Sequence, residues 1–400
     1  MQVRSILDAD VAGKRLLVRA DLNVPIQDGK VTDSTRIDRF AKGMKPLLAK
    51  GARLVILTHM GRPNGAMNAA LSVDKLRPAL SEALGVPIRF SDVSVGKSAE
   101  IHASALKDGE VLLCENVRYV RGEETNDPGI AQQFAQLGDF YVNDAFSCAH
   151  RAHASTEAIA YLMPAFAGPL LIEELEALTS ALESPQLPSV AIVGGAKVSS
   201  KIAVLKNLVS RVDHLIVGGG MANTFLFANG APVGNSLHEA DQMDTVKEIA
   251  LLAKTSGCTI HLPSDVVVAR EFKAGADTKS VSADACPANA MILDAGPAAV
   301  MEFSQVLAAS RTILWNGPLG AFEMQPFDAA TVALARKAAE LTRAGKCLSV
   351  AGGGDTVAAL NVAGVTDDFT YVSSAGGAFL EWLEGRTLPG VSALMQDEKV

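Results

Sequence analysis

The sequence has few cysteines and none of the spacings that a disulfide or zinc framework requires. Its five cysteines, at positions 114, 148, 258, 286 and 347, are scattered without a Cys-x-x-Cys pair. We therefore expect reduced packing residues rather than a zinc ribbon or a stapled secreted domain. No apolar run reaches membrane-spanning length without a charge or a turn signal, and the first ten residues do not read as a signal peptide. These absences predict a cytoplasmic protein that does not bind membranes.

Several cofactor and catalytic motifs are also missing. The dinucleotide fingerprint G-x-G-x-x-G fails because Gly218 and Gly220 are followed by Asn223. Gly96-Lys-Ser98 resembles the end of a Walker A loop, but Ser91 stands where its first glycine is required. Neither a G-x-S-x-G elbow nor an H-E-x-x-H helix occurs. A serine hydrolase and a zincin are thus excluded, a nicotinamide dehydrogenase is less favoured, and phosphate chemistry without a covalent nucleophile remains.

Basic residues are in the minority, since the net charge is −8. A general nucleic-acid binder would show the opposite balance, so any arginines that gather at one place become more informative. The 400 residues, 48% of them apolar, are too many for one ordinary core and predict two globular domains. We place the junction at 171–188, where a helical pattern ends in the segment Ser184–Pro188.

Apolar segments alternate with helical segments throughout, which predicts an α/β protein built from parallel βαβ units. In the first half, polar residues follow each predicted strand, and parallel strands bring such residues to one edge of the sheet. The residues expected to converge there are Arg36, His59, Arg62, Arg118 and Arg151. Each arginine alone is more often a solvated surface residue, but a cluster of them suits a phosphate or carboxylate. A metal site at His150 and His153 is a weak alternative, because the pair lacks further ligands.

In the second half, predicted strands run into glycine turns. Lys197 and Lys201 are expected on one face of a helix that starts at Ala196, where an anion would relieve their repulsion. The segment from Ser349 to Leu360 predicts a strand, a glycine turn and a helix start, which together form an anion site. Its Asp355 either caps that helix or holds Mg²⁺ on nucleotide phosphates. Glu323 likewise either caps the next helix or accepts hydrogen bonds from a ribose, and the residues from about 270 to 284 are expected to form a charged loop.

A series of motifs spanning nearly the whole chain resembles the phosphoglycerate kinase family. They are, in order, Arg19–Pro25, Thr58–Pro63, Glu115–Arg118, Tyr141–Phe146, Ala149–His153, Gly194–Val198, Gly218–Asn223, Trp315–Pro318 and Gly352–Thr356. The resemblance implies two Rossmann-like three-layer α/β/α domains with parallel sheets that face each other across a cleft. The first, 1–170 with a returning tail at about 386–400, would bind phosphoglycerate, and the second, 189–385, the nucleotide.

The resemblance also implies roles for individual residues. Those implied for 3-phosphoglycerate or 1,3-bisphosphoglycerate are Asp21, Asn23, Arg36, His59, Arg62, Arg118 and Arg151. Those implied for ADP or ATP are Gly194, Gly195, Lys201, Gly218, Gly219, Asn316, Pro318, Glu323, Gly353, Gly354, Asp355 and Thr356, with Asp355 directed at Mg²⁺. Those implied around the transferring phosphoryl group are Arg36, Lys197, Gly353, Gly376 and Gly377. A monomer that closes its cleft before direct in-line transfer is implied as well.

The sequence departs from the family pattern at three places. Ser147-Cys148 replaces a Gly-Thr pair, Ser200 an Asp, and Ser374-Ala375 a Thr-Gly pair. Ala375 matters most, because it requires a negative φ where glycine sets no limit. Two other classes stay open at this point: a nicotinamide oxidoreductase, which shares the architecture, and a non-catalytic module that uses the arginine cluster to bind an anionic partner.

Overall fold

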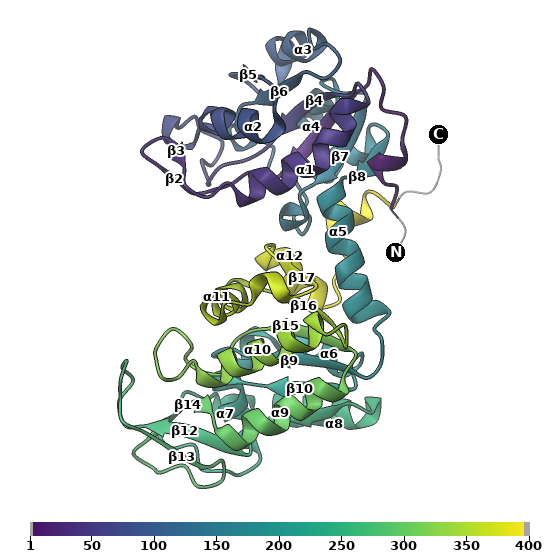
Figure 1. Cartoon of the computed structure of the whole chain (residues 1–400). Coiled ribbons are helices and arrows are strands. Elements are labelled where there is room, and N and C mark those ends of the chain that lie inside the picture. The colour runs from purple at the N-terminus through teal and green to yellow at the C-terminus, as the bar shows by residue number, and fades with distance from the viewer. Residues whose placement is uncertain (1–2, 396–400) are drawn as a thin grey trace. The chain divides into compact units, whose positions relative to one another are not determined.

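The computed structural model describes residues 3–395 and consists of two compact units, each with its own sheet (Figure 1). One unit contains the described residues up to Leu175 and those from Thr387 onward, and the other contains Glu176–Arg386. The change between units thus falls inside the segment 171–188. The described part of the tail belongs to the first unit, and its last five residues lie outside the description.

The first unit has a six-stranded sheet in which every pair of neighbours is parallel. In spatial order the strands are β5 (Ile88–Ser91), β6 (Val111–Cys114), β4 (Arg53–Leu57), β1 (Arg15–Ala20), β7 (Phe140–Asp144) and β8 (Ala165–Ala167). Its helices are α1 (Thr35–Ala49), α2 (Arg77–Leu84), α3 (Gly96–Ser104), α4 (Pro128–Ala135), the start of α5 (Pro169–Leu178) and α13 (Pro389–Ser392). Alternate residues of β1, Leu16 and Val18, pack with Phe40 and Met44 of α1 in one core. A strand buried on both faces explains the continuous apolar run.

The second unit repeats this design. Its parallel strands, in spatial order, are β11 (Thr259–His261), β10 (His214–Val217), β9 (Ser189–Val193), β15 (Thr312–Asn316), β16 (Leu348–Gly352) and β17 (Tyr371–Ser373). Its helices are α6 (Ile202–Val209), α7 (Gly219–Ala228), α8 (Met243–Ser256), α9 (Pro297–Ala309), α10 (Ala329–Arg343), α11 (Gly354–Ala363) and α12 (Gly376–Leu383). The predicted fold class, α/β with two parallel sheets flanked by helices, is therefore confirmed.

The second unit also holds a small antiparallel sheet that the sequence did not predict. Its strands lie in the order β13 (Thr278–Ser282), β12 (Asp265–Ala269) and β14 (Met291–Ala295). The expected charged loop to about residue 284 is thus wrong at β13. Four of the five β13 residues are exposed, so this edge strand has no apolar alternation, and its pairing with β12 decides its conformation.

The predicted helix start at Ala196 is wrong as well. A 3-10 turn covers Val198–Ser200, and α6 begins only at Ile202. Serine side chains and backbone find other partners here: Ser199 N donates to Glu239 Oε2 at 2.9 Å, and Ser200 Oγ donates to Lys197 O at 2.7 Å. Such local hydrogen bonds compete with a regular helix. Lys197 and Lys201 flank the 3-10 turn in extended or irregular conformations and do not share a helix face.

Within the described residues, no helix is long and apolar enough to cross a membrane.

The core of the second unit allows a matched test on one helix. Phe303 of α9 is 1% exposed inside the core, whereas Met301, two residues earlier, is 60% exposed. We expect Phe303→Ala to lower the unfolding free energy of this unit by about 3–5 kcal/mol, through lost burial and an unfilled cavity. Met301→Ala should change it by less than about 0.5 kcal/mol. Urea denaturation of both variants measures the difference, and equal values would contradict the described packing of α9.

Candidate functional site: two anion pockets at strand ends

A pocket of about 200 Å³ lies at the carboxyl ends of the first unit's strands. Six of the seven residues that the resemblance implied for phosphoglycerate line it: Asp21, Asn23, His59, Arg62, Arg118 and Arg151. The seventh, Arg36, is joined to this group by an ion pair from its Nη1 to Asp21 Oδ2 at 2.7 Å. The other lining residues are Gly61, Ser147, Cys148 and His150. The arginines therefore lie close together in the structure, as the sequence predicted.

Backbone and side-chain hydrogen bonds fix these loops to one another. Arg118 follows β6 in a 3-10 turn, and its Nη1 donates to Gly61 O at 2.8 Å. The backbone N–H of Gly61 in turn donates to Asn23 Oδ1 at 3.4 Å, and Leu22 N donates to Thr58 Oγ1 at 3.1 Å. The loops after β1, β4 and β6 thus support each other, which holds the pocket in shape before a ligand arrives.

Positive charge dominates this pocket. Its lining contains three guanidinium groups, on Arg62, Arg118 and Arg151, and one carboxylate, on Asp21. The Asp21 carboxylate already accepts hydrogen bonds at Oδ2 from Arg36 and from Ser147 Oγ, the latter at 2.5 Å. The pairing with Asp21 also explains an arginine in the first turn of α1, where a cation is otherwise unfavourable. The arrangement suits a ligand with two anionic groups.

His59 and Cys148 form the buried side of the pocket. His59 is 7% exposed, and its Nδ1 lies 3.3 Å from Arg19 Nη2 and 4.0 Å from Cys148 Sγ. Burial, together with the charges of Arg19 and Arg118, lowers the pKa of His59 to about 2. Burial also raises the pKa of the Cys148 thiol. His59 is therefore a neutral imidazole at physiological pH, and Cys148 is a packing residue in place of the family's usual threonine.

The second unit has a larger pocket, of about 510 Å³, at the corresponding end of its sheet. The implied nucleotide residues that line it are Gly195, Gly218, Gly219, Pro318, Glu323 and Asp355. Much of the remaining wall is apolar, with Leu237, Phe272, Met291 and Phe322 among its residues. A flat heterocycle can lie against such a wall, while glycine amides and Asp355 leave polar atoms for the rest of a nucleotide.

Four other implied nucleotide residues, Gly194, Lys201, Asn316 and Thr356, belong to a group of hydrogen bonds next to this pocket. Lys201 Nζ donates to Gly194 O at 2.8 Å and to Asn316 Oδ1 at 2.7 Å. Asn316 Nδ2 donates to Gly352 O at 2.8 Å, and Thr356 Oγ1 accepts from Gly317 N at 2.7 Å. Burial lowers the pKa of Lys201 to about 8, against the opposing charge of Asp355. Among the described residues the Lys201 ammonium donates to neutral oxygens, so it can still take an anionic partner.

Two glycines here are required by neighbouring protein atoms. A Cβ on Gly194 would lie 1.7 Å from the carbonyl oxygen of Pro318, because the loops after β9 and β15 cross at this point. Gly353 has φ +99°, a conformation that favours glycine, and a Cβ there would lie 2.7 Å from Asn316 Nδ2. The glycines therefore let strand ends approach each other, in addition to exposing amides.

Neither Asp355 nor Glu323 occupies the N-cap of a helix, which was the alternative role considered for each. Gly353, which has no side chain, occupies the N-cap of α11, and Asp355 lies in the first turn of that helix, exposed and lining the pocket. The helix after Glu323 begins only at Ala329, with Asp328 at its N-cap. Both carboxylates are thus available to a ligand in this pocket.

Lys197, Ala375 and Gly376 lie in other loops at this end of the second unit. Lys197 is exposed and precedes the 3-10 turn, and Gly376 begins α12 after β17. Ala375 is the N-cap of α12 with φ −99°, which suits an L residue, so the missing glycine causes no backbone strain. His150 and His153, the weak metal alternative, have different partners: His150 Nε2 accepts from Arg151 Nε at 3.1 Å, and His153 Nδ1 lies 3.4 Å from Glu123 Oε2.

Some pocket residues were not predicted. Ser147 and Cys148 appeared in the sequence only as departures from a pattern, and the apolar nucleotide-side residues Leu237, Phe272 and Met291 gave no signal at all. Leu237 and Phe272 are isolated apolar residues in loops, which carry no information about the distant segment that they will contact. Only the small antiparallel sheet brings Met291 to the pocket, and that sheet was itself missed.

An arginine-lined anion pocket on one parallel α/β unit, and a glycine-lined pocket beside a lysine on another, are features of an α/β phosphotransferase. Comparison with known proteins gives the particular family. The family model described as Phosphoglycerate kinase matches residues 6–386. The chain belongs to the phosphoglycerate kinase family.

Relatives and solved structures agree with this assignment. The chain is 58% identical over 392 residues to the phosphoglycerate kinase of Cereibacter sphaeroides, covering 98% of this chain and 99% of that protein. It is 57% identical over 395 residues to that of Zymomonas mobilis, covering 98% of this chain and all of that protein. The structure of phosphoglycerate kinase from Coxiella burnetii matches with a TM-score of 0.92 at 42% identity, covering 99% of both chains.

The chain is accordingly a kinase of glycolysis that converts 1,3-bisphosphoglycerate and ADP into 3-phosphoglycerate and ATP. Of the three classes that the sequence left open, the nicotinamide oxidoreductase and the non-catalytic module are thereby excluded.

The neutral, buried His59 makes a prediction about acid stability. An unfolded histidine binds a proton below about pH 6.5, whereas folded His59 stays neutral until about pH 2, so the unfolded state gains protons as the pH falls. The stability that His59 contributes is present above its unfolded pKa and is lost below it. Between about pH 6.5 and pH 5 the loss should be on the order of 2 kcal/mol.

Urea denaturation at both pH values checks this. His59→Gln, which keeps an acceptor for Arg19, should remove this part of the pH dependence, while His102→Gln, a change in the same unit outside the pocket, should keep it. An unchanged pH dependence in His59→Gln would contradict the neutral assignment.

Proposed function

We propose that the arginine-lined pocket of the first unit binds 3-phosphoglycerate or 1,3-bisphosphoglycerate, and that the pocket of the second unit binds Mg-ADP or Mg-ATP. The observation that carries the proposal is the gathering of Arg62, Arg118 and Arg151 in one pocket whose single carboxylate is already paired. The substrate carries a phosphate and a carboxylate, and guanidinium groups bind both through paired, charge-assisted hydrogen bonds.

In the first pocket, Arg62, Arg118 and Arg151 take the phosphate that is not transferred. Asp21, Asn23 and His59 take the hydroxyl and carboxyl end, because Asp21 and Asn23 follow β1 beside the His59 loop. Arg36, which is tied to Asp21, stands next to that end and can neutralise the phosphoryl group in transfer.

In the second pocket, the apolar wall takes the base, and Glu323 accepts hydrogen bonds from the ribose hydroxyls. The amides of Gly194, Gly195, Gly353 and Gly354, together with Lys201, Asn316 and Thr356, hold the phosphates. The start of α11 adds its helix dipole, which favours negative charge. Gly218, Gly219 and Pro318 form the floor under the nucleoside.

Asp355 fits a role as a Mg²⁺ ligand. It is an exposed carboxylate that lines the nucleotide pocket, and carboxylate oxygens together with substrate phosphates are the usual Mg²⁺ ligands. The bound ion would neutralise charge on the nucleotide phosphates. The protein's own part is to place the reacting groups in line and to surround the phosphoryl oxygens with Lys197, Arg36 and the amides of Gly353 and Gly376.

Transfer between substrates on different units requires that the units close and exclude water, which would otherwise hydrolyse the acyl phosphate. We propose the segment 171–188 and the region of Ser373 as the hinges. The chain is proposed to act as a cytoplasmic monomer, as befits the family's place in glycolysis.

Separate substrate sites are tested by a pair of variants and two titrations. Arg151→Ala should weaken 3-phosphoglycerate binding by about tenfold or more, since a charge-assisted pair is lost, and leave Mg-ADP affinity unchanged. Asp355→Asn should weaken Mg-ADP binding by a similar factor and leave 3-phosphoglycerate affinity unchanged. Isothermal calorimetry measures all four constants. If either variant lost the wrong ligand, the assignment of substrates to units would be incorrect.

Lys197→Ala tests the proposal that Lys197 contacts the phosphoryl group during its transfer. A cation that acts in the transition state raises kcat, so its removal should lower kcat by more than about tenfold, equivalent to ~1.4 kcal/mol of barrier, with little change in KM. Lys247→Ala, an exposed lysine of α8 outside both pockets, is the control and should keep full activity. If kcat falls less than about tenfold in Lys197→Ala, the role proposed for this lysine is wrong.

A further inference from the structure

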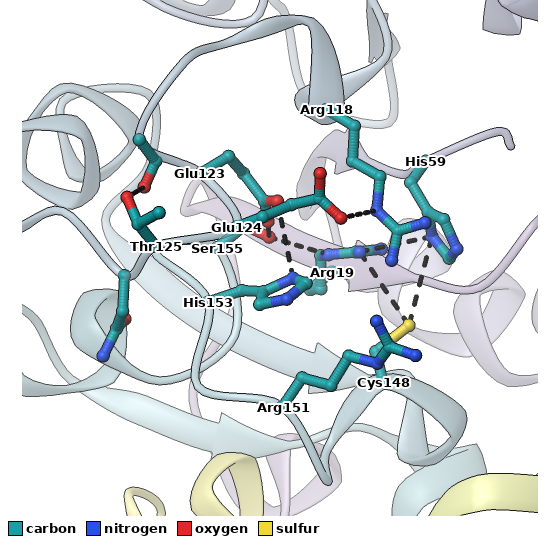
Figure 2. Close-up of polar contacts among 12 residues, drawn as sticks. Arg19, His59, Arg118, Glu123, Glu124, Thr125, Cys148, Arg151, His153 and Ser155 are labelled. Atoms are coloured by element: carbon teal, nitrogen blue, oxygen red, sulfur yellow. Dashed lines mark hydrogen bonds and ion pairs between the residues drawn. The ribbon is translucent and has the colours of Figure 1, made fainter. Parts of the chain in front are cut away.

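A buried charged network lies next to His59, Arg118 and Cys148, three of the residues that line the arginine-lined pocket (Figure 2). Its members are Arg19, Glu123, His153 and Ser155, and none of them lines the pocket. Arg19, Glu123 and Ser155 are fully buried, and His153 is 5% exposed. Opposite charges taken out of water have a large desolvation cost, so Arg19 and Glu123, buried next to a ligand pocket, call for a physical role.

The network connects Glu123 to His59 through two intermediate side chains. Ser155 Oγ donates to Glu123 Oε1 at 2.6 Å, and Arg19 Nε donates to Ser155 Oγ at 2.9 Å. Arg19 Nη1 donates to the carbonyl oxygen of Ala20 at 2.7 Å, which fixes the plane of the guanidinium. The remaining nitrogen, Nη2, then lies 3.3 Å from Nδ1 of His59, and Figure 2 shows the contacts that lead from Glu123 past Ser155 and Arg19 to His59.

The chemistry of arginine decides the direction of the last contact. A guanidinium is always protonated and has only donors, so His59 Nδ1 must be the acceptor and carries no proton. A neutral imidazole has one N–H, which therefore sits on Nε2. His59 lines the pocket while its Nδ1 is turned to Arg19, so Nε2 is the ring nitrogen left to a ligand.

We propose that Glu123 is a positioning residue that, through Ser155 and Arg19, holds His59 as a neutral Nε2–H donor toward the substrate. Glu123 and Ser155 supply the acceptor and countercharge that keep Arg19 in place, and Arg19 selects the tautomer of His59. The tautomer follows from the contacts alone. Only its effect on substrate binding depends on the proposed assignment of this pocket to phosphoglycerate.

The electrostatics of the network support this direction. Burial alone would raise the pKa of Glu123, but hydrogen bonds from His153 and Ser155 and the charge of Arg19 overcome burial and lower it to about 2. Glu123 is thus a carboxylate at physiological pH. The charged and titratable groups that face His59 are Arg19, Arg118, Glu123, His153 and Cys148. Arg19 and Arg118 oppose a positive charge on His59, so the site offers a hydrogen-bond donor whose state does not change around neutral pH.

The experiment is ¹⁵N NMR of the full chain with labelled histidine, from about pH 5 to pH 8, which spans the ordinary titration of histidine. Throughout this range we expect one His59 species, with the shift of a protonated nitrogen at Nε2 and of an unprotonated nitrogen at Nδ1. His59→Gln assigns the signal. A proton on Nδ1, or titration of His59 inside this range, would overturn the proposal.

A double variant tests the part played by the network. Arg19→Met/Glu123→Gln removes both charges with little change in volume, which avoids leaving one buried charge without its partner. His59 should then show a fraction of the Nδ1–H tautomer, and KM for 3-phosphoglycerate should rise about fivefold or more with kcat changed less than about twofold, since uniform binding is lost. Unfolding midpoints of the variant and wild type establish that it folds.

Glu110→Gln is the matched control, because it removes a carboxylate from an exposed ion pair with Arg89 in the same unit. It should change neither the His59 signal nor KM. A double variant that keeps a pure Nε2–H signal would overturn the role of the network. An altered tautomer with an unchanged KM would support the network's control of the tautomer and instead count against the assignment of the pocket to phosphoglycerate.

Discussion

The parallel pairing of β1 with its two neighbours is the constraint on which the first site depends. Arg19 on β1 lies level with Leu57 on β4 and with Asn143 on β7. This register makes the three strands end together, so their loops are forced to share one edge of the sheet. A shift in register along any of these strands would move Asp21 away from the arginines of the pocket. It would also move Arg19 away from His59. The strand register therefore determines which polar side chains meet at this edge of the sheet.

The same edge concentrates charges that water would otherwise keep apart. The pocket tolerates Arg62, Arg118 and Arg151 together because Asp21 and the carboxylate of Glu124, 3.4 Å from Arg118 Nε, offset part of their repulsion. Arg19 and Glu123 are shielded from solvent; Arg19 contacts His59 directly, and Glu123 is linked to Arg19 through Ser155. The exposed layer therefore attracts the ligand, while the buried layer orients the polar groups that meet it.

Much of this arrangement follows from the sequence, because strand ends and glycine turns leave local signals. Most of the parallel strands of both units were predicted from apolar runs followed by polar residues or glycine turns, and the arginine cluster from where those strands end. Features that depend on residues far away in the sequence were not predicted. The exposed strand β13 exists only through pairing with β12, and the turn at Val198–Ser200 follows from Glu239, forty residues away. Glu123 gave no signal either, since a carboxylate in a charged segment looks like a solvated one.

The central claim is that the strand-end arginines of the first unit hold phosphoglycerate while Asp355 of the second faces the metal-bound nucleotide. A crystal structure of the chain soaked with 3-phosphoglycerate and Mg-ADP tests it most directly. The account predicts the phosphate within hydrogen-bond distance of Arg62, Arg118 and Arg151, and Mg²⁺ within coordination distance of Asp355. A phosphate bound away from these arginines, or a nucleotide-bound Mg²⁺ that Asp355 does not coordinate, would contradict it.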